Sequence, residues 1–381
     1  MLVVDARCLA QRFSGIQRYT LHVLKALVRS EALRGAGGGG VRVLLADPGG
    51  IDHPLHDALQ AAGVELLATG AAPSLLHDQR PGRWRAWLAG AGDAPTLLCP
   101  DAFAPLRAPR GHAGLRRVIT LHDVIPLVRA ADLRRSWKGR APWLWRRWLR
   151  AQVRAADRVL TVSVFSRQDI ARVLGVRADR ISVVGNAVEP LADAAPERQV
   201  RAPYVLCVGR ADPYKNQVGL VEAFSSLLEQ PEVGSACPGL RLVLAGTADP
   251  RYPEADARAQ ALGVADRVDR VQPTQAQLAA LYRDAAVVAV PSLYEGFGLP
   301  AVEAMLAGAP VVSSDAASLP EVVGDAALMV DAADRGALAS TMSRVLLEPV
   351  LRGALVKRGH ANAARWSLDH FAERLASALR R

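Results

Sequence analysis

The sequence predicts an α/β protein with two doubly wound, Rossmann-like domains that face each other across a cleft. Short apolar runs rich in Val, Leu and Ile recur along the chain, and longer segments with helical periodicity separate them. Nearly continuous apolar character, rather than strict alternation, is typical of strands buried on both faces of a parallel sheet. The length of 381 residues is comfortable for two domains and too long for one compact core.

The predicted strands form one group in each half of the chain. Strand–helix–strand order within each group predicts a doubly wound parallel sheet. The first group is Leu2–Val4, Val41–Ala46, Val64–Ala68, Thr96–Cys99, Val118–Leu121, Val159–Val162 and Ile181–Val184. The second group is Tyr204–Val208, Leu240–Ala245, Ala286–Val290, Pro310–Ser313 and Ala326–Val330.

A segment with three prolines and several charges, Glu189–Pro203, breaks this pattern and is interpreted as the linker. We therefore expect an N-terminal Rossmann-like domain over residues 1–190 and a C-terminal Rossmann-like domain over residues 191–360. A C-terminal helix within residues 361–381 is expected to cross back to the first domain. The cleft between two such domains is a favoured place for a ligand.

Composition limits the function classes. Half of the residues are hydrophobic and 22% are charged, which argues against disorder. The net charge of +10 suggests a partner rich in phosphate or an anionic surface. The four cysteines are widely spaced without a C-x-x-C motif, so the sequence predicts neither a disulfide framework nor a zinc site. No apolar run reaches the roughly 18 residues of a membrane span, and no signal peptide is recognised, so we expect a cytoplasmic protein.

The most informative segment is Ala289–Asp315, AVPSLYEGFGLPAVEAMLAGAPVVSSD. It predicts a strand that ends at Val290, a loop, and a helix with Pro300 at its first helical position. Gly296 and Gly298 allow the backbone to approach a ligand closely and to point N–H groups toward it. Because a helix N-terminus carries partial positive charge, we expect an anion to bind there.

Two carboxylates flank this anion site, Glu295 just before it and Glu303 in what we expect to be the first helical turn. Such an arrangement would repel a phosphate unless each carboxylate binds hydroxyl groups, and a sugar nucleotide carries hydroxyls on both sides of its diphosphate. An E-x7-E spacing is common by chance, and an early helical Glu is often only a favourable dipole partner. The surrounding motif makes the functional interpretation more specific. The predicted donor-binding residues here are Glu295, Gly296, Phe297, Gly298, Leu299 and Glu303.

The stretch YEGFGLPAVEAMLAGAPVVSSDAASLPEVVGDAALMVD resembles the C-terminal signature of the family 4 retaining glycosyltransferases, which have the GT-B fold. The resemblance covers nearly the whole chain and includes DARCLAQRFSGIQRYTLHVLKAL, TLHDVIPL, SVFSRQDI and GRADPYKN. It implies transfer of a hexose from a nucleotide diphospho-sugar with retention of the anomeric configuration. It also implies a donor site mostly in the C-terminal domain and an acceptor site mostly in the N-terminal one. The H-D-x-x-P and S-G-I-x-R-Y patterns suggest a mannosyl- or rhamnosyltransferase that uses a GDP-sugar such as GDP-mannose.

The loop after the strand Tyr204–Val208 contains Arg210 and Lys215, within CVGRADPYKN. Both side chains could reach a diphosphate, Arg as a fork of donors and Lys as a mobile point charge. The alternative is two ordinary exposed basic residues. The family resemblance implies that they stabilise the departing nucleotide diphosphate in place of a metal, and the chain has no D-x-D motif. We therefore expect no metal and no cofactor beyond the nucleotide sugar itself.

In the N-terminal half, VITLHDVIPLV places His122 at the C-terminal end of a buried strand, where open α/β sheets bind ligands. A lone His is more often structural. The resemblance implies that His122 lies against the transferred sugar as an orienting and hydrogen-bonding group. Gly15, within FSGIQRY, suits a tight loop that approaches the diphosphate, and the resemblance implies this donor-binding role. The predicted catalytic residues are His122, Arg210, Lys215 and Glu295.

One departure from the family pattern affects the donor. The run Arg267–Thr274, RVDRVQPT, replaces the usual V-x-F-x-G, whose backbone lies beside the nucleotide base in the family. The identity of the base is therefore open, and a UDP-sugar donor is the alternative to a GDP-sugar.

The segment from residue 129 to residue 158 is rich in Arg and contains Trp137, Trp143, Trp145 and Trp148. Basic charge with indole rings suits an anionic lipid headgroup region, although an ordinary helix with solvated arginines is the simpler alternative. We expect peripheral attachment to the inner face of the cytoplasmic membrane, and an acceptor glycan linked to a polyprenyl diphosphate in polysaccharide or lipopolysaccharide synthesis. A non-enzymatic protein that binds anionic surfaces or nucleic acid is the competing class, but no nucleic-acid recognition motif is present.

Overall fold

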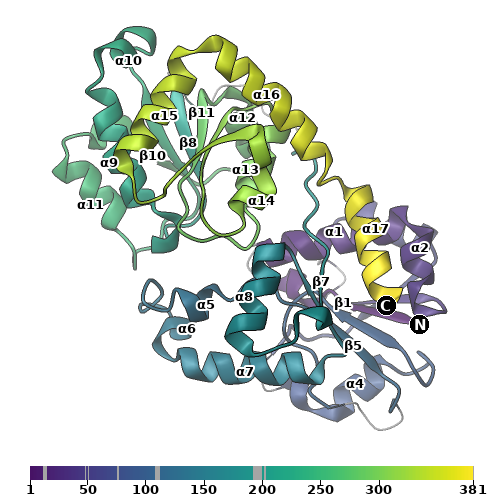
Figure 1. The fold of residues 1–381 in the computed structure, drawn as a ribbon. Helices are drawn as coiled ribbons and strands as arrows, with labels where there is room; N and C mark the ends of the chain where they lie inside the picture. Colours follow the sequence, from purple (N-terminus) through teal and green to yellow (C-terminus); the bar gives the residue numbers. More distant parts are fainter. Residues whose placement is uncertain are drawn as a thin grey trace. The chain divides into compact units, whose positions relative to one another are not determined.

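The computed structural model describes residues 1–11, 15–47, 49, 51–74, 77–107, 112–191, 200 and 203–380. The chain divides into two compact units (Figure 1). Unit 1 comprises Met1–Val128, Ala141–Ala187 and Ser367–Arg381, and unit 2 comprises Arg129–Arg140 and Val188–Trp366. Most of the predicted linker Glu189–Pro203 lies outside the described residues.

Unit 1 contains a parallel sheet with the strand order β3-β2-β1-β4-β5-β6-β7. Its strands are β1 (Leu2–Asp5), β2 (Val41–Leu45), β3 (Val64–Ala68), β4 (Thr96–Cys99), β5 (Arg116–Thr120), β6 (Arg158–Thr161) and β7 (Ile181–Val183). Its α-helices are α1 (Gly15–Arg29), α2 (Glu31–Arg34), α3 (His53–Ala61), α4 (Pro81–Trp87), α5 (Ile125–Val128), α7 (Pro142–Ala155), α8 (Val164–Leu174) and α17 (Leu368–Arg380).

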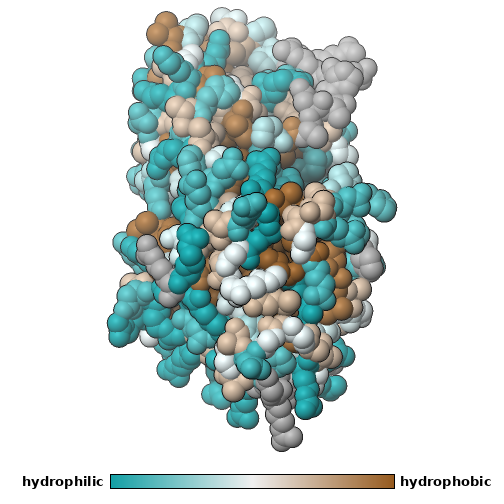
Figure 2. Space-filling view, turned by 90° about the vertical axis from the view of Figure 1, so that its right-hand side faces the viewer, coloured by the Kyte–Doolittle hydropathy of each residue, from teal (hydrophilic) through white to brown (hydrophobic). Residues whose placement is uncertain are grey.

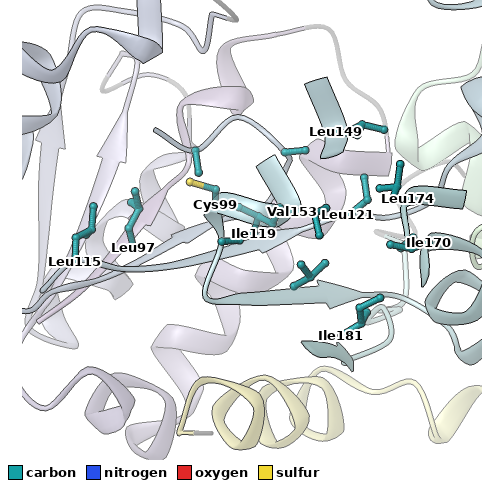
Figure 3. Close-up of a cluster of buried hydrophobic side chains, with 14 of the residues drawn as sticks. Leu97, Cys99, Leu115, Ile119, Leu121, Leu149, Val153, Ile170, Leu174 and Ile181 are labelled. Atoms are coloured by element: carbon teal, nitrogen blue, oxygen red, sulfur yellow. The ribbon is translucent and has the colours of Figure 1, made fainter. Parts of the chain in front are cut away.

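The unit 1 strands are buried on both faces. Val3 belongs to a hydrophobic cluster that also contains side chains of α4, α7 and α8, whereas its neighbours Leu2 and Val4 are buried on the opposite face. Figure 3 shows this cluster, in which Ile119 of β5 lies near Val153 of α7. The two-sided burial explains why these strands are continuous apolar runs in the sequence.

The C-terminal helix α17 packs against α1 and α2, so both ends of the chain belong to unit 1 (Figure 1). An edge-to-face contact between Phe371 and Tyr19 of α1, with ring centroids 5.4 Å apart, contributes to this packing. Arg374 also donates a hydrogen bond of 2.8 Å to the carbonyl of Val184.

Most of the face seen in Figure 2 is hydrophilic, with the brown, hydrophobic side chains gathered mainly in its lower half.

Unit 2 contains a second parallel sheet with the order β10-β9-β8-β11-β12-β13. Its strands are β8 (Tyr204–Val208), β9 (Arg241–Ala245), β10 (Val268–Val271), β11 (Val287–Val290), β12 (Val311–Ser314) and β13 (Ala327–Val330). Its α-helices are α6 (Trp137–Arg140), α9 (Gln217–Leu228), α10 (Pro231–Ala236), α11 (Glu254–Ala261), α12 (Gln275–Asp284), α13 (Leu299–Leu306), α14 (Leu319–Val323), α15 (Arg335–Leu347) and α16 (Pro349–Ala364). Two parallel, doubly wound sheets confirm the predicted fold class.

Strand β10 is the one described strand that the apolar pattern of the sequence does not predict. It pairs with β9 at the edge of the sheet, and its four residues are all half-buried. Asp269 forms an ion pair with Arg241 of β9, and Arg270 forms one with Asp256 of α11. Charged partners of this kind replace the apolar burial that marks the central strands, so the apolar pattern is weak here.

Each sheet has one switch point, which is the place where the order of the strands across the sheet changes direction relative to the sequence. In unit 2 this point lies between β8 and β11, which pair directly although β9 and β10 separate them in sequence. In unit 1 it lies between β1 and β4. Open α/β sheets bind ligands in the crevice at the carboxyl ends of the strands at such a point. Among the described helices, none is long and apolar enough to cross a bilayer.

Candidate functional site

The loops that follow β8 and β11 carry the predicted donor residues of unit 2 and meet at its switch point. Lys215 ends a short 3-10 helix, Pro213–Lys215, after β8. Tyr214 in this turn accepts a hydrogen bond of 2.7 Å at its carbonyl from the amide of Leu293, after β11. Asn216 has a left-handed backbone, with φ of 55°, and its side-chain amide donates to the carbonyls of Pro291 and Ala332. These bonds hold the two loops together.

Lys215 and Glu295 form the central contact of this site. The ammonium Nζ lies 2.6 Å from Glu295 Oε1, although the two residues are 80 positions apart in the sequence. The hydroxyl of Ser292 donates a second hydrogen bond of 2.7 Å to the same oxygen. The Glu295 side chain is 8% exposed and that of Lys215 is 16% exposed. The two predicted catalytic groups therefore lie together in a largely desolvated position.

Three buried serines fix the loop that carries Glu295. Ser318 donates a hydrogen bond of 2.9 Å to the backbone carbonyl of Glu295, and Ser314 donates one of 2.6 Å to the carbonyl of Ser292. Ser292 itself contacts the Glu295 carboxylate. These serines could not be selected from the sequence, because a serine in such a segment carries no distinctive pattern. The proximity of Ser292 to Glu295 in P-S-x-x-E was the one available signal.

The loop that contains Gly296 and Gly298 leads into the N-terminus of α13. Gly298 has φ of 96° and immediately precedes the helix, where a Cβ atom would lie 2.6 Å from Leu319. Leu299 and Pro300 are the first two helical residues, so Pro300 is at the second position rather than the first. The ring of Phe297 is buried edge-to-face against Trp366 at 4.8 Å. A role of Phe297 toward a donor would therefore be exerted by its backbone.

Glu303 lies in the second turn of α13, one turn later than the sequence predicts. The first turn of this helix contains no acidic residue. Its side chain is buried, and its Oε2 accepts a hydrogen bond of 2.9 Å from the hydroxyl of Tyr282 in α12. Glu303 also takes part in the lining of a cavity of about 200 Å³. It is lined by Glu189, Pro190, Leu191, Ala279, Arg283, Glu303, Leu306 and Ala307. A hydroxyl-bearing group can thus reach the vicinity of Glu303.

Arg210 lies at the end of β8 between two carboxylates. Its guanidinium is 3.1 Å from Asp212 and 3.8 Å from Asp249. Hydrogen bonds from Arg251, with a smaller contribution from Arg210, lower the pKa of Asp249 to about 2. The Arg210 side chain is 56% exposed, so it is accessible to an incoming anion. Both predicted diphosphate ligands, Arg210 and Lys215, therefore have carboxylate partners in the ligand-free protein.

In unit 1, His122 follows β5 as predicted. Its Nε2 lies 2.9 Å from the carbonyl oxygen of Pro100, at the end of the neighbouring strand β4, and its ring packs edge-to-face on Tyr19. Desolvation lowers the pKa of His122 to about 4. The ring is therefore neutral at pH 7, donates its proton to Pro100 and presents Nδ1 as an acceptor. This state suits hydrogen bonding and orientation rather than acid catalysis.

Gly15 is the first residue of α1, and the three residues before it lie outside the described part of the chain.

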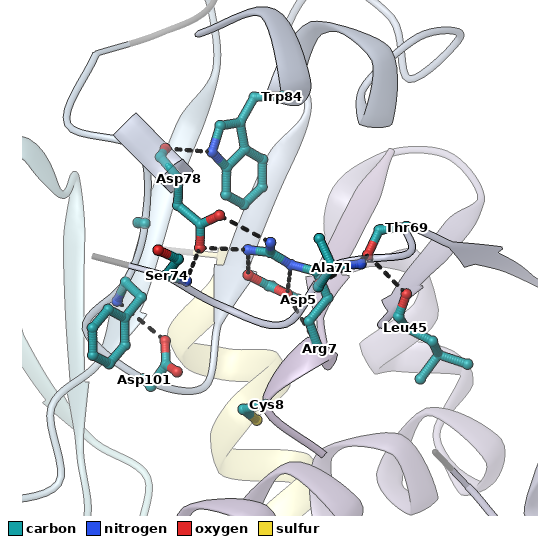
Figure 4. Close-up of polar contacts among 12 residues, drawn as sticks. Asp5, Arg7, Cys8, Leu45, Thr69, Ala71, Ser74, Asp78, Trp84 and Asp101 are labelled. Atoms are coloured by element: carbon teal, nitrogen blue, oxygen red, sulfur yellow. Dashed lines mark hydrogen bonds and ion pairs between the residues drawn. The ribbon is translucent and has the colours of Figure 1, made fainter. Parts of the chain in front are cut away.

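At the switch point of unit 1, the buried guanidinium of Arg7 binds Asp5 through two hydrogen bonds of 2.7 Å and also binds Asp78 (Figure 4). The ring of Trp87 lies 4.4 Å from the Arg7 guanidinium carbon. One cation thus neutralises part of the charge of two buried carboxylates.

A third carboxylate in this region belongs to Asp101, which follows β4 and lies in no motif that the sequence identifies. It is buried, and its Oδ1 accepts a hydrogen bond of 3.1 Å from the amide of Phe103 (Figure 4). Burial, together with the charge of Asp5, raises the pKa of Asp101 to about 7. A carboxyl group that titrates near neutrality at the ligand-binding edge of a sheet is a functional candidate.

The basic, Trp-rich segment does not present all of its indoles to solvent. On α7, Trp143 is 66% exposed and Leu144 is 49% exposed, whereas Trp145 is only 7% exposed and belongs to the unit 1 core. Trp148 is half-buried and packs against that core. The expectation that Trp145 faces an anionic surface is therefore wrong. The exposed face of α7 combines Trp143 and Leu144 with Arg146, Arg147, Arg150 and Arg154.

Among the described residues, no group of three or more His, Cys, Asp and Glu side chains has an arrangement that could hold a metal ion. Metal independence stays a prediction. The described part of unit 2 brings together Arg210, Lys215, Glu295 and the N-terminus of α13, while Gly15 and His122 belong to unit 1.

Comparison with known domain families gives two matches. Residues 13–190 match the domain described as Glycosyltransferase Family 4. Residues 190–362 match the domain described as Glycosyl transferases group 1. Each match covers most of one sheet and its helices.

Relatives that are more than 30% identical to the chain are also named as glycosyltransferases. A D-inositol 3-phosphate glycosyltransferase of Mycolicibacterium smegmatis is 31% identical over 389 residues, which cover 88% of this chain and 87% of that protein. One of Acidothermus cellulolyticus is 34% identical over 241 residues, or 58% of this chain and 52% of that protein. An MMP alpha-(1->4)-mannosyltransferase of Mycolicibacterium hassiacum is 34% identical over 205 residues, or 52% and 47%. The chain thus spans about half the length of the last two relatives.

Solved structures resemble the fold over nearly its whole length. Sucrose-phosphate synthase from Thermosynechococcus elongatus has a TM-score of 0.71 at 23% identity, with 99% of this chain and 97% of that chain covered. Anabaena HepE in complex with UDP has a TM-score of 0.69 at 19% identity, with 99% and 98% covered. WaaG, a glycosyltransferase involved in lipopolysaccharide biosynthesis, has a TM-score of 0.67 at 18% identity, with 99% of both chains covered.

Proposed function

Because the chain belongs to the family 4 glycosyltransferases and has their GT-B fold, we propose that it transfers mannose from GDP-mannose to a lipid-linked oligosaccharide with retention of the anomeric configuration. The observation that carries this proposal is the ion pair of Lys215 with Glu295 at the switch point between β8 and β11. A cation for the diphosphate and a carboxylate for sugar hydroxyls lie side by side there, next to a helix N-terminus that attracts anions.

In this account the diphosphate lies between the N-terminus of α13 and the side chains of Arg210 and Lys215. The bond between the anomeric carbon and the diphosphate oxygen breaks, and the acceptor oxygen bonds to that carbon from the same face. The proton of the acceptor hydroxyl passes to the leaving phosphate, so no side chain needs to act as base. Arg210 and Lys215 stabilise the negative charge that develops on the leaving group. No metal is assigned to this step.

The two glutamates have different roles. Glu295 binds hydroxyls of the hexose, close to the carbon where positive charge develops as its bond breaks. Glu303 binds the ribose hydroxyls, and the cavity that Glu303 helps to line supports this assignment. His122, neutral at pH 7, accepts a hydrogen bond from the transferred sugar.

The choice of GDP-mannose rests on the sequence resemblance and on the named mannosyltransferase among the relatives. A UDP-sugar donor is the specific alternative, since HepE was solved with UDP. The membership in a glycosyltransferase family favours an enzyme over a protein that only binds anionic surfaces. We also propose that the exposed face of α7 attaches the protein to the inner face of the cytoplasmic membrane. There it would reach an acceptor linked to polyprenyl diphosphate in polysaccharide or lipopolysaccharide synthesis.

Thermal unfolding with a panel of GDP- and UDP-sugars tests the donor. A ligand at a hundred times its Kd stabilises the folded state by about 2.7 kcal/mol, so the true donor should raise Tm by several degrees. GDP-mannose is expected to give the largest rise in Tm. In a separate assay, the protein should release GDP from GDP-mannose when a lipid extract is added as the source of acceptor. A larger rise with UDP-sugars than with GDP-sugars would overturn the GDP assignment. The variant Lys215→Ala is the control and should lose most of the rise.

A further inference from the structure

Ser292 contacts the same oxygen of Glu295 that Lys215 contacts. Oε1 of Glu295 lies 2.7 Å from the Ser292 hydroxyl and 2.6 Å from Lys215 Nζ. Among the described residues, no hydrogen-bond partner is found for the second oxygen, Oε2. The carboxylate is therefore fixed through one oxygen, and the other is available to a ligand.

A bound diphosphate would change this arrangement. Its negative charge attracts the Lys215 ammonium, which has three donors to divide among its partners. If the Lys215 ammonium turns toward the diphosphate, the Ser292 hydroxyl can still donate its hydrogen bond to Oε1 of Glu295. Ser292 is 2% exposed, and its own carbonyl is bound by Ser314, so it has little freedom to follow Lys215.

We propose that Ser292 is a positioning residue that holds the Glu295 carboxylate toward the hexose while Lys215 binds the diphosphate. This inference rests on the proposed role of Glu295. A hydrogen bond to a charged group is stronger than one between neutral groups, and a carboxylate that rotates away loses its alignment with the sugar. Ser292 would thus act on the transfer step through Glu295, without touching the substrate.

Steady-state kinetics of Ser292→Ala test the proposal. We expect kcat to fall by about tenfold to a hundredfold, the range that corresponds to one hydrogen bond to a charged group. The donor KM and the Kd of the free nucleotide diphosphate should change by less than about threefold. Ser292→Thr, which keeps the hydroxyl, should recover most of kcat. Ser313→Ala is the matched control, because Ser313 is also a buried serine near this loop, and its hydroxyl donates to the carbonyl of Ser314 rather than to Glu295.

A double-mutant cycle with Glu295→Ala separates positioning from a purely structural role. If Ser292 acts only through the carboxylate, then Ser292→Ala should cost nothing further in the Glu295→Ala background. Equal losses in both backgrounds would overturn the proposal, and so would an unchanged kcat in Ser292→Ala. If Ser292→Ala does not fold, Ser292→Cys supplies the same readout, since a thiol is a weaker donor.

The two hypotheses fail in different ways. An unchanged kcat in Glu295→Ala would remove the proposed function of Glu295 itself. A large loss in Glu295→Ala, with additive effects of Ser292→Ala, would leave the function of Glu295 standing and would contradict only the positioning role of Ser292.

Discussion

The hydroxyl of Tyr282 donates a hydrogen bond of 2.9 Å to Oε2 of Glu303, and both side chains are buried. This contact between α12 and α13 holds the carboxylate that we assign to the ribose. Replacing Glu303 by Ala should raise the donor KM by roughly ten- to a hundredfold, because charged hydrogen bonds contribute about 1.5–3 kcal/mol each. The value of kcat should change less, since the ribose is bound alike in the ground and transition states.

Tyr282→Phe removes only the hydroxyl that orients Glu303, so we expect a smaller rise of the donor KM, about two- to tenfold. Tyr204→Phe is the matched control: Tyr204 is also buried, and its hydroxyl donates to the carbonyl of Leu281 rather than to Glu303. Equal effects of the two Tyr variants on KM would show that Tyr282 contributes to packing and not to donor binding.

Donor turnover should survive metal removal. In our account Arg210, Lys215 and the N-terminus of α13 supply the positive charge that other transferases obtain from a divalent cation. Assays with excess EDTA should therefore retain most of the activity measured without it. Complete loss with EDTA, restored by Mg²⁺ or Mn²⁺, would show that a metal takes part in the reaction.

The exposed face of α7 should bind anionic membranes. The double variant Trp143→Ser with Leu144→Ser removes its exposed apolar side chains, and we expect its partition onto phosphatidylglycerol vesicles to fall by about tenfold, with activity on a short soluble acceptor preserved. Replacing Arg147 by Gln should weaken the same binding by about 1 kcal/mol at low salt. Co-sedimentation with vesicles measures both effects.

Val350→Ser supplies the control for this experiment, because Val350 is 87% exposed on α16 and lies outside the basic segment. It should leave vesicle binding unchanged. Equal vesicle binding by wild type and by the Trp143 and Leu144 double variant would exclude these side chains as a membrane contact.

Asp101 should make stability fall as pH rises. Its pKa is about 7 in the folded protein against an ordinary value of 3.8, so folding favours the protonated carboxyl. The resulting stability is present below pH 3.8 and is lost as pH rises to about 7. Asp101→Asn keeps a neutral acceptor for the amide of Phe103 and escapes this loss. Its advantage in Tm over wild type should therefore be larger at pH 8 than at pH 5.

Thermal melts at the two pH values measure this difference. Asp57→Asn is a suitable control, since Asp57 has a side chain that is 75% exposed. An Asp101→Asn variant with the same Tm difference from wild type at both pH values would contradict the assignment of a buried, protonated Asp101.

The sequence was sufficient for the parts of the fold that depend on apolar burial. The central strands are continuous apolar runs because helices cover both of their faces. Strand β10 could not be found in this way, since Asp269 and Arg270 are stabilised by ion pairs with neighbouring elements. On α7, by contrast, the buried residues Trp145, Leu149 and Val153 recur every four positions. That spacing indicates a core-facing stripe, and it could have separated Trp145 from the exposed Trp143.

The sequence predicts those residues of the candidate site that lie within a recognisable motif. Lys215 and Glu295 were both selected from their loops, but their direct contact depends on the pairing of β8 with β11 and could not be predicted from residues 80 positions apart. Ser292 and Ser318 act through hydrogen bonds to the Glu295 loop, and a serine has no pattern that distinguishes this role. Asp101 depends on long-range burial beside Asp5, which strand order determines.

The central claim is that Lys215 binds the diphosphate and Glu295 binds the hexose, from positions 2.6 Å apart in the ligand-free protein. Calorimetric titration of free nucleotide diphosphate into wild type, Lys215→Ala and Glu295→Gln tests it most directly. Lys215→Ala should weaken binding by at least about tenfold, as expected for the loss of a charged contact. Glu295→Gln should bind the diphosphate as tightly as wild type or several-fold more tightly, because Lys215 no longer has a charged competitor. A comparable loss of affinity in both variants would contradict this division of roles.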